Sequence, residues 1–225
     1  MAGIQDFAVF EDDFFGGGTE TTSGQGSPWV FTATGSPTAT YPADVAGTNG
    51  RLLMTLTAGN EVQNGCLSFG DKLNFDIDLL EYVEFRAVMG QATFTSANQL
   101  VFGMGSEQVD DPTATTEHAF FRVLGATSTT QLYVETDDET NDNSLVDTGT
   151  TFINVEKKFR ISFTHGKADV RFYVNDNRVA ADTTFDMSNY SGGLQPYIQI
   201  QKTTGTTAGT AAFDYIKVVS RRAAL

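Results

Sequence analysis

The stretch KFRISFTHGKADVRFYVNDNRVAAD, residues 158–182, decides the fold class. Two runs in it alternate apolar and polar residues, and the apolar members are Phe159, Ile161 and Phe163, then Val170, Phe172 and Val174. A period of two is that of a strand with one buried face. The linkers His165-Gly166-Lys167 and Asn175-Asp176-Asn177 contain residues that suit tight hairpin turns. The stretch therefore predicts three consecutive antiparallel strands, with the six apolar side chains facing one buried layer.

The same alternation recurs along most of the 225 residues, and no helical stripe exceeds two turns. Further strands are predicted at 5–12, 29–34, 51–57, 64–69, 80–89, 98–104, 117–125, 130–136, 194–202 and 211–220. Their spacing, with Gly, Asn, Asp and Thr between them, is typical of a sandwich or barrel. With 40% hydrophobic residues the chain can form a sizeable core. The predicted fold is all-β, an antiparallel two-sheet β-sandwich forming one domain over residues 1–225.

Two segments interrupt the alternation. Residues 16–28 and 36–50 are rich in small residues and are predicted to be long loops. Backbone in such segments is poorly held by its own core, so we expect it to become ordered against a partner. Residues 137–143 (DDETNDN) are predicted to form a polar loop tip.

Net charge, apolar runs, the first residues and the cysteine count limit the partners and compartments to be expected. The formal net charge is −14 and the 14 Lys and Arg residues are scattered, which argues against a nucleic-acid partner. No apolar run approaches the roughly 20 residues of a membrane span. Met1–Asp6 lacks the features of a secretory signal, so synthesis in a host cytoplasm is expected. Cys66 is the single cysteine, and we expect it to be a buried small hydrophobe in a short strand.

Four segments together carry a family resemblance: FAVFEDDF at 7–14, YVEFR at 82–86, VRFYVN at 170–175 and FDYIKV at 213–218. In this order they resemble the concanavalin A-like lectin/glucanase jelly roll, which includes laminin-G-like domains. Together with LQPYIQIQK at 194–202, the pattern is similar to that of virion structural proteins of tailed bacteriophages. The resemblance implies a jelly-roll sandwich and allows lectin, enzyme and structural roles.

Two enzyme branches of this fold can be compared with the sequence. The glucanase branch uses Glu-x-Asp-x-(x)-Glu on one strand, and the nearest stretch considered is Asp78, Glu81 and Glu84. A spacing of three places successive side chains on opposite faces of a strand, so these carboxylates are not expected to converge.

The alginate-lyase branch has an Arg-x-Glu-x-Arg strand and a Gln-x-His strand. Glu84 and Arg86 match part of the first, but Tyr82 replaces its first Arg. Gln199 matches the second, but Gln201 replaces its His, and a glutamine cannot exchange a proton near neutral pH. We therefore predict no catalytic residues. Glu84 and Arg86 share a face of their strand, and we expect them to form a cross-strand or same-strand charge pair.

The remaining polar candidates have ordinary interpretations. His118 and His165 are expected at the surface or rim. Oxygen-bearing side chains alternate at Asp137, Glu139, Asn141 and Asn143, a set that suits Ca²⁺. The Gly and terminal Glu of an EF-hand are missing, so a solvated loop tip is favoured and a weak Ca²⁺ site is the alternative. No metal or cofactor is predicted.

Aromatic residues could stack on a sugar, as in lectin-like members of the fold. The candidates are Trp29, Tyr41, Tyr133, Tyr173 and Tyr190. Trp29 lies between Pro28 and Val30-Phe31, which favours an anchor in the core or a loop instead.

Three functions remain open. The preferred hypothesis is a non-enzymatic bacteriophage virion protein, a capsid decoration (cement) protein on the outer capsid surface. It would bind the major capsid protein lattice as a homotrimer, since trimers suit threefold positions. The alternative is a carbohydrate-binding module of a tail fibre or tailspike that recognises a cell-surface glycan. A third is an enzyme with unrecognised geometry.

Overall fold

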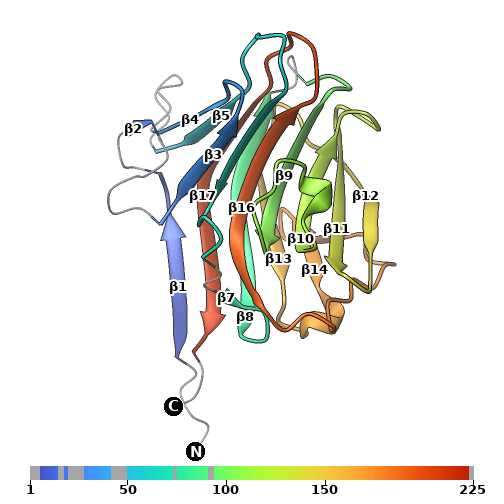
Figure 1. Cartoon of the computed structure of the whole chain (residues 1–225). Coiled ribbons are helices and arrows are strands. Elements are labelled where there is room, and N and C mark those ends of the chain that lie inside the picture. The colour runs from blue at the N-terminus through green and yellow to red at the C-terminus, as the bar shows by residue number, and fades with distance from the viewer. Residues whose placement is uncertain are drawn as a thin grey trace, which may run out of the picture.

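The computed structural model describes residues 6–14, 18–19, 28–41, 50–72, 75–90 and 94–222 (Figure 1). Sheet A contains, in spatial order, β15 (Asn177–Val179), β14 (Arg171–Val174), β13 (Lys157–Ser162), β8 (Leu80–Gly90), β17 (Thr210–Arg221), β5 (Leu52–Thr55), β4 (Thr38–Tyr41) and β2 (Gly18–Thr19), and β1 (Phe7–Asp12) pairs with β17. Sheet B contains β12 (Asn143–Thr151), β11 (Gln131–Asp138), β10 (Glu117–Leu124), β9 (Asn98–Gly105), β16 (Gly193–Lys202), β6 (Gln63–Ser68) and β3 (Val30–Thr34), and β7 (Phe75–Asp76) pairs with β16.

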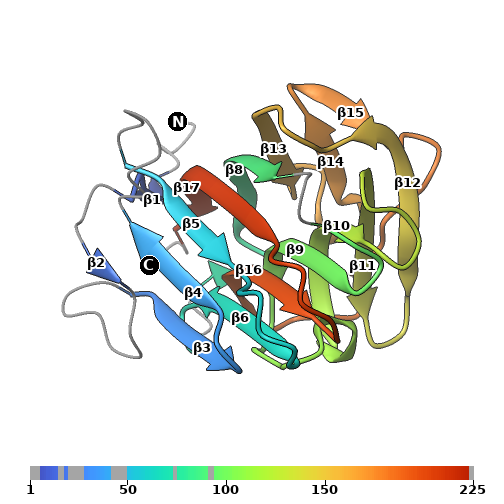
Figure 2. The same ribbon diagram turned by 90° about the horizontal axis from the view of Figure 1, so that it is seen from above.

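The two sheets lie face to face, as the view from above shows (Figure 2). The strand pairs within each sheet are antiparallel, so the expected two-sheet antiparallel sandwich is confirmed. In the parts of the chain that the structure describes, two short 3₁₀ helices, η2 (Pro112–Ala114) and η3 (Lys167–Asp169), lie in loops. Within the described parts of the chain, no helix has the length and apolar character needed to cross a membrane.

The three-strand prediction for residues 158–182 is confirmed by β13, β14 and β15. Ile161 pairs with Phe172, and Val174 pairs with Asn177. Asn175 and Asp176 between them have φ of 49° and 65°, the left-handed values that a two-residue hairpin turn requires. All six predicted apolar side chains are buried, with 5% exposure at most.

Aromatic rings join the two sheets in the centre of the core. The ring of Phe102 in sheet B lies 5.0 Å from that of Phe159 and 5.5 Å from that of Phe213, both in sheet A, in edge-to-face geometry. On its own sheet, Phe102 stacks on Phe121 at 5.4 Å. Such pairs add to the free energy gained by apolar burial alone.

The long-loop prediction for residues 36–50 is wrong at its start. Thr38–Tyr41 forms β4, which pairs with β5 through Thr38 and Thr55, and Ala39 is completely buried. Within 16–28, Gly18–Thr19 forms the two-residue β2 against β4. These strands are short and consist mostly of Thr, Ala and Gly, so they carry little of the apolar alternation that marks a strand. Of the remaining residues in both predicted loops, the structure describes Pro28, Ser36, Pro37 and Gly50. The rest lie outside the described residues.

Strand β12 was also not predicted. Its pairing with β11 is irregular, with register shifts, and Leu145 and Gly149 within it have positive φ. These distortions disturb the period of two, so the sequence of β12 does not read as a regular strand.

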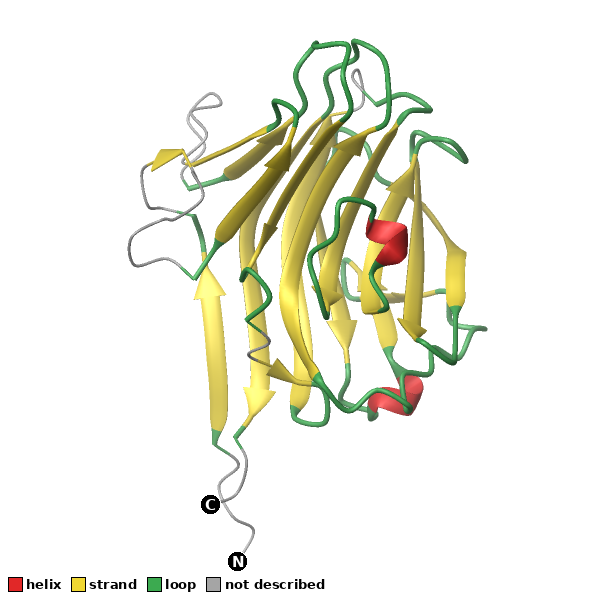
Figure 3. Cartoon of the chain, in the orientation of Figure 1, coloured by secondary structure: helices red, strands yellow, loops and turns green. Residues whose placement is uncertain are grey.

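The two sheets differ in how their outer faces are covered. In sheet A, burial alternates along β8 and β17 as expected for one solvated face. In sheet B, every residue of β6 and β9 is buried. The cause is the covering segment, residues 106–116 between β9 and β10, which folds back over the outer face of sheet B and contains η2 (Figure 3).

Candidate functional site

A buried ion pair lies on the outer face of sheet B. Arg122 on β10 donates from Nη1 to both carboxylate oxygens of Glu135 on β11, at 3.1 and 3.2 Å. The side chains are only 6% and 3% exposed. Arg122 Nη2 donates to Gln99 Oε1 at 2.7 Å, and the Gln99 amide donates in turn to Gln201. Alternation along four neighbouring strands, β11, β10, β9 and β16, therefore places a connected polar network on this face.

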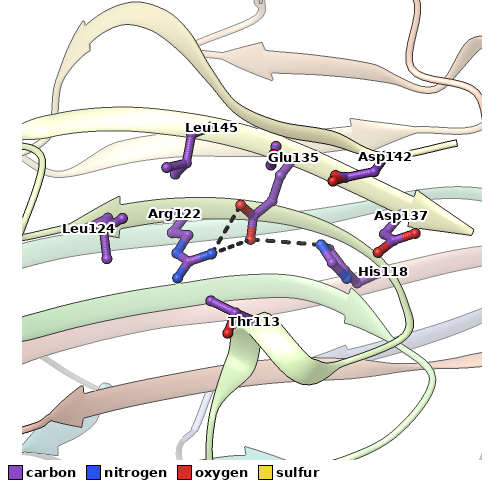
Figure 4. Close-up of a pocket in the computed structure, with 9 residues that line it drawn as sticks. Thr113, His118, Arg122, Leu124, Glu135, Asp137, Asp142 and Leu145 are labelled. Carbon is purple, nitrogen blue, oxygen red and sulfur yellow. Dashed lines mark hydrogen bonds and ion pairs between the residues drawn. The ribbon is translucent and has the colours of Figure 1, made fainter. Parts of the chain in front are cut away.

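A pocket of about 310 Å³ opens beside this pair (Figure 4). Its walls come from η2, β10, β11, β12 and the turn between β11 and β12, and the lining residues are Thr113, His118, Arg122, Leu124, Glu135, Asp137, Asp142, Ser144 and Leu145. Two leucines thus face hydroxyl, carboxylate, guanidinium and imidazole groups. A small concave site of this volume and mixed lining is at the lower end of the roughly 300–1,000 Å³ of typical small-ligand pockets.

His118 is not at the surface, so the sequence-based expectation for it is wrong. The residue is 6% exposed, its ring stacks on Phe120 at 4.5 Å, and its Nδ1 lies 2.9 Å from the carbonyl oxygen of Thr115. A neutral ring would donate from Nδ1 to that carbonyl and leave Nε2 free, 3.7 Å from Glu135 Oε1. The burial results from the covering segment, which the strand pattern does not reveal. The sequence near His118 contains one indication of this burial, because Phe120, two residues further on, is apolar and shares the outer face with His118. His165, in contrast, is exposed as expected.

The covering segment is bound to sheet B by hydrogen bonds from amide side chains. Gln199 Nε2 donates to the carbonyl oxygens of Val109 and Asp110, both at 3.0 Å. Gln201 Nε2 donates to the Asp110 carbonyl at 2.7 Å. The Asp110 carboxylate accepts hydrogen bonds from Asn64 Nδ2 at 3.1 Å and from Thr34 Oγ1 at 2.9 Å. This part of the outer face is therefore filled by the chain itself.

A small apolar cluster lies on the same face, made of Cys66, Val101, Phe120 and Tyr197. Cys66 is completely buried in β6, which confirms its assignment as a buried hydrophobe. Burial raises the pKa of the Cys66 thiol, so the thiol is protonated and unreactive near neutral pH. Burial likewise raises the pKa of Tyr197, whose hydroxyl donates to Gln199 Oε1 at 2.5 Å.

Three carboxylates at a spacing of two were missed by the sequence reasoning. Glu135, Asp137 and Glu139 follow the Glu-x-Asp-x-Glu spacing of the glucanase branch, on β11 and just beyond it. Glu135 and Asp137 line the pocket. Glu139 follows the last residue of β11, has φ of 66° and is exposed, and its backbone N–H donates to Asp137 Oδ1 at 2.8 Å. The chain thus turns away before the third carboxylate can reach the pocket.

The carboxylates considered from sequence do not meet. Glu84 on sheet A accepts from Arg160 Nε and Nη2 at 2.9 and 2.7 Å and from Tyr215 Oη at 2.6 Å. Glu81 pairs with Arg221 at 2.8 Å. Burial, followed by the bond to Glu84, raises the pKa of Tyr215. The expected pair of Glu84 with Arg86 is therefore wrong, because Glu84 forms a cross-strand pair with Arg160 and Arg86 pairs with Glu156 and Asp214.

The two alginate-lyase-like fragments lie on different sheets. Arg86 is on β8 of sheet A, where it pairs with Glu156 and with Asp214. Gln199 and Gln201 are on β16 of sheet B, beneath the covering segment. The aromatic core separates the two outer faces, so the fragments form no common site.

The polar tip at 137–143 is organised by Asp138. Its carboxylate accepts from the backbone N–H groups of Thr140, Asn141 and Asn189, at 3.0, 2.6 and 2.9 Å. Burial alone would raise the pKa of Asp138, but these N–H donors more than offset it, and the pKa lies below its ordinary value of 3.8. In the described parts of the chain, no group of three His, Cys, Asp or Glu residues is placed to hold a metal ion.

Of the aromatic candidates for sugar stacking, the four with described side chains do not line the pocket. Trp29 is 1% exposed, its Nε1 donates to Asp12 Oδ2 at 2.7 Å, and its ring packs on Phe69 at 4.9 Å, so the anchor interpretation is confirmed. Tyr133 is buried, and Tyr173 and Tyr190 are half-buried. The side chain of Tyr41 lies outside the described residues.

Comparisons with solved structures define the fold class. The carbohydrate recognition domain of Emp47p superposes with a TM-score of 0.60 at 12% identity, over 93% of this chain and 94% of that one. An endo-1,3-beta-glucanase from Streptomyces sioyaensis gives 0.60 at 16% identity, over 98% of both chains. A carbohydrate esterase, vb_24B_21, from the Shiga toxin-encoding bacteriophage phi24B gives 0.51 at 15% identity, over 92% and 100%.

The chain therefore has the jelly-roll fold of concanavalin A-like lectins and glucanases, as its sequence resemblance implied. The sequence matches no protein-family model, and no curated protein sequence matches it significantly. At these identities the likeness establishes the fold alone.

Proposed function

We propose that this protein binds a carbohydrate without cleaving it, in the pocket on the outer face of sheet B. The observation that carries the proposal is the pocket itself, whose lining combines Leu124 and Leu145 with Thr113, Ser144 and Asp142. A sugar ring has apolar C–H faces and a rim of hydroxyl groups that both donate and accept hydrogen bonds. A lining that combines apolar surface with hydroxyl and carboxylate groups matches both features.

The pocket chemistry favours binding over hydrolysis. Glycoside hydrolysis needs one carboxyl group to protonate the leaving oxygen and a second to act as nucleophile or base. Both carboxylate oxygens of Glu135 accept hydrogen bonds from Arg122 Nη1, so this side chain is engaged within the protein rather than directed at a leaving oxygen. Asp137 caps the turn at Glu139, and Glu139 lies outside the pocket lining. Glu135 and Asp137 are therefore both engaged within the protein, which disfavours an acid–nucleophile pair made by these two carboxylates.

The structural neighbours support a carbohydrate ligand by analogy. They include a carbohydrate recognition domain, a glucanase and a phage protein described as a carbohydrate esterase. These chains share the sandwich with this protein, but one fold hosts many functions, so the proposal rests on the lining of the pocket.

The experiment is a glycan array read with the intact chain and two tryptophan variants. Ser144→Trp fills the pocket from an exposed position on β12, and Thr151→Trp places the same side chain at an exposed position of that strand outside the pocket lining. We expect the parent and Thr151→Trp to bind the same glycans and Ser144→Trp to lose them. A parent that binds no glycan, or a Ser144→Trp variant that binds like the parent, would refute the proposal.

A second candidate, the capsid decoration protein, is favoured by the exposed edge strand β1. Phe7 and Val9 on β1 are 45% and 55% exposed, and among the described strands β1 pairs with β17 alone. An apolar, half-paired edge strand is a surface that a partner protein can cover. In this proposal the strand contacts the major capsid protein lattice on the virion surface, and the protein assembles as a homotrimer.

Co-sedimentation with preformed capsids tests the second candidate. The parent should pellet with capsids, and the double variant Phe7→Ser, Val9→Thr should not, while its glycan profile on the array stays unchanged. Sedimentation velocity of the free protein reports the trimer. A parent that stays in the supernatant with capsids present, or a double variant that pellets equally, would count against decoration through β1.

A further inference from the structure

We propose that the pocket receives the end of a glycan chain and not an internal segment. The inference rests on the proposed carbohydrate-binding function and adds the class of ligand. Its basis is the covering segment, which limits the pocket on one side.

The outer face of sheet B has the polar residues of a long groove, but most of its length is already occupied. Asn64, Gln199 and Gln201 lie on β6 and β16, in line with Gln99 and Arg122 of the pocket network. Their amide groups are the kind that bind sugar hydroxyls. In this structure each donates to the main chain or side chain of Asp110 instead.

The covering segment also forms a wall of the pocket. Thr113, in η2, is one of the lining residues. η2 is stabilised from its own sequence, because the side chain of Asp111 accepts from the Thr113 backbone N–H at 3.0 Å and Pro112 follows directly. A glycan that entered between the leucines would therefore meet this turn before it could reach β16.

The segment is fastened at several points, so a ligand would not displace it easily. Gln108 N–H donates to Asp71 Oδ1 at 2.7 Å, and Gln195 Nε2 donates to the same oxygen at 2.8 Å. At its base, Ser106 N–H donates to the carbonyl oxygen of Glu117 at 2.9 Å. A polysaccharide that ran across all strands would have to break these bonds as well as those to the amide side chains. A chain end can enter the pocket without breaking any of them.

The test varies the number of chain ends at constant mass of polysaccharide. Curdlan, mixed-linkage glucan and chitin are each presented to the intact protein before and after limited cleavage by a matching endo-glycosidase. We expect the amount of protein bound to rise in proportion to the chain ends, and the soluble oligosaccharides released to compete. Binding that is independent of the number of ends would overturn this inference and leave the proposed function standing. No binding to any of the three, before or after cleavage, would overturn both.

Two variants test the role of the covering segment. Replacing residues 107–115 by a short Gly-Ser linker should expose Gln199 and Gln201 and increase affinity for the uncleaved polymer, by roughly tenfold if two hydrogen bonds are regained. Asp110→Ala removes only the bonds from Asn64 and Thr34 and should give a smaller increase, which serves if the shortened variant does not fold. A folded variant of either kind that binds uncleaved polymer no better than the parent contradicts the inference.

Discussion

The guanidinium of Arg122 and the carboxylate of Glu135 form an ion pair that is almost completely removed from solvent, on a sheet face that strand alternation alone would assign to water. Gln99 accepts a further bond from Arg122, so the pair belongs to a network rather than standing alone. Nη1 and Nη2 of Arg122 and both oxygens of Glu135 are engaged within the protein, and the buried Nε of Arg122 has no hydrogen-bond partner among the described residues. The pair therefore shapes the pocket wall and is not a free charge offered to a ligand. Its energetic weight can be measured.

Removing one partner of this pair should be strongly destabilising. Arg122→Met leaves the Glu135 carboxylate buried without its partner, and we expect a loss of about 3–5 kcal/mol in the free energy of unfolding. The double variant Arg122→Met, Glu135→Leu should recover most of that loss. Arg160→Met, which breaks the partly exposed pair with Glu84 on sheet A, should change stability by only about 0–1 kcal/mol. Urea titrations that gave the same loss for Arg122→Met and Arg160→Met would contradict the burial argument.

Truncation of a core aromatic tests the sandwich. Phe172 is completely buried and packs edge-to-face on Phe121 and Phe185, at 5.3 and 4.9 Å. Phe172→Ala should lower the free energy of unfolding by about 3–5 kcal/mol. Its neighbour Tyr173 points to the outer face, so Tyr173→Ala should be much less destabilising. A loss below about 1 kcal/mol for Phe172→Ala in a reversible denaturant titration would show that the wrong face is buried.

The pH dependence of stability should carry a contribution from Asp138. Its pKa is lowered in the folded protein, so its hydrogen bonds contribute in full above the ordinary value of 3.8 and are lost as the pH falls through the lower folded value. Asp138→Asn should therefore reduce the free energy of unfolding at neutral pH by about 1–3 kcal/mol, and by progressively less below about pH 4. Asp182→Asn, at an exposed loop position, is the control. An undiminished difference at about pH 3 would show that Asp138 is not the titrating group.

Catalytic turnover should be absent. We expect no release of reducing ends from laminarin or mixed-linkage glucan, because Glu135 is held by Arg122 and Glu139 is outside the pocket. We also expect no β-elimination from alginate, because Glu84 and Gln201 lie on different sheets. Activity that disappeared in both Glu135→Gln and Asp137→Asn would show that the pocket is an active site.

Sheet A could be predicted from sequence to a large extent. Its long strands bury one face and expose the other, so the alternation of Phe159, Ile161 and Phe163 with polar neighbours is directly visible. Short strands such as β4 escaped, because four residues of Thr, Ala and Tyr carry no clear period. The turn at Asn175-Asp176 was recognisable because few residues adopt positive φ without strain.

The candidate site could not be predicted, because it depends on a loop that folds over a sheet. The glutamines of β16 look like solvated positions, and their burial follows only from contacts with Val109 and Asp110, far away in sequence. The spacing of two between Glu135 and Asp137 is present in the sequence, but Asp137 is assigned to the polar tip at 137–143 and not to the strand that contains Glu135. Even when recognised, it does not reveal that Glu139 turns away, which is a property of the backbone after β11.

The most direct test of the central claim is an amide chemical-shift titration of the isotopically labelled protein with the glycan that binds best on the array. If the pocket on sheet B is the site, the largest shifts fall on Arg122, Glu135, Ser144 and Leu145, and the amides of Glu84 and Arg160 on sheet A stay unchanged. Shifts confined to sheet A or to β1, with the pocket amides unmoved at saturation, would contradict the account.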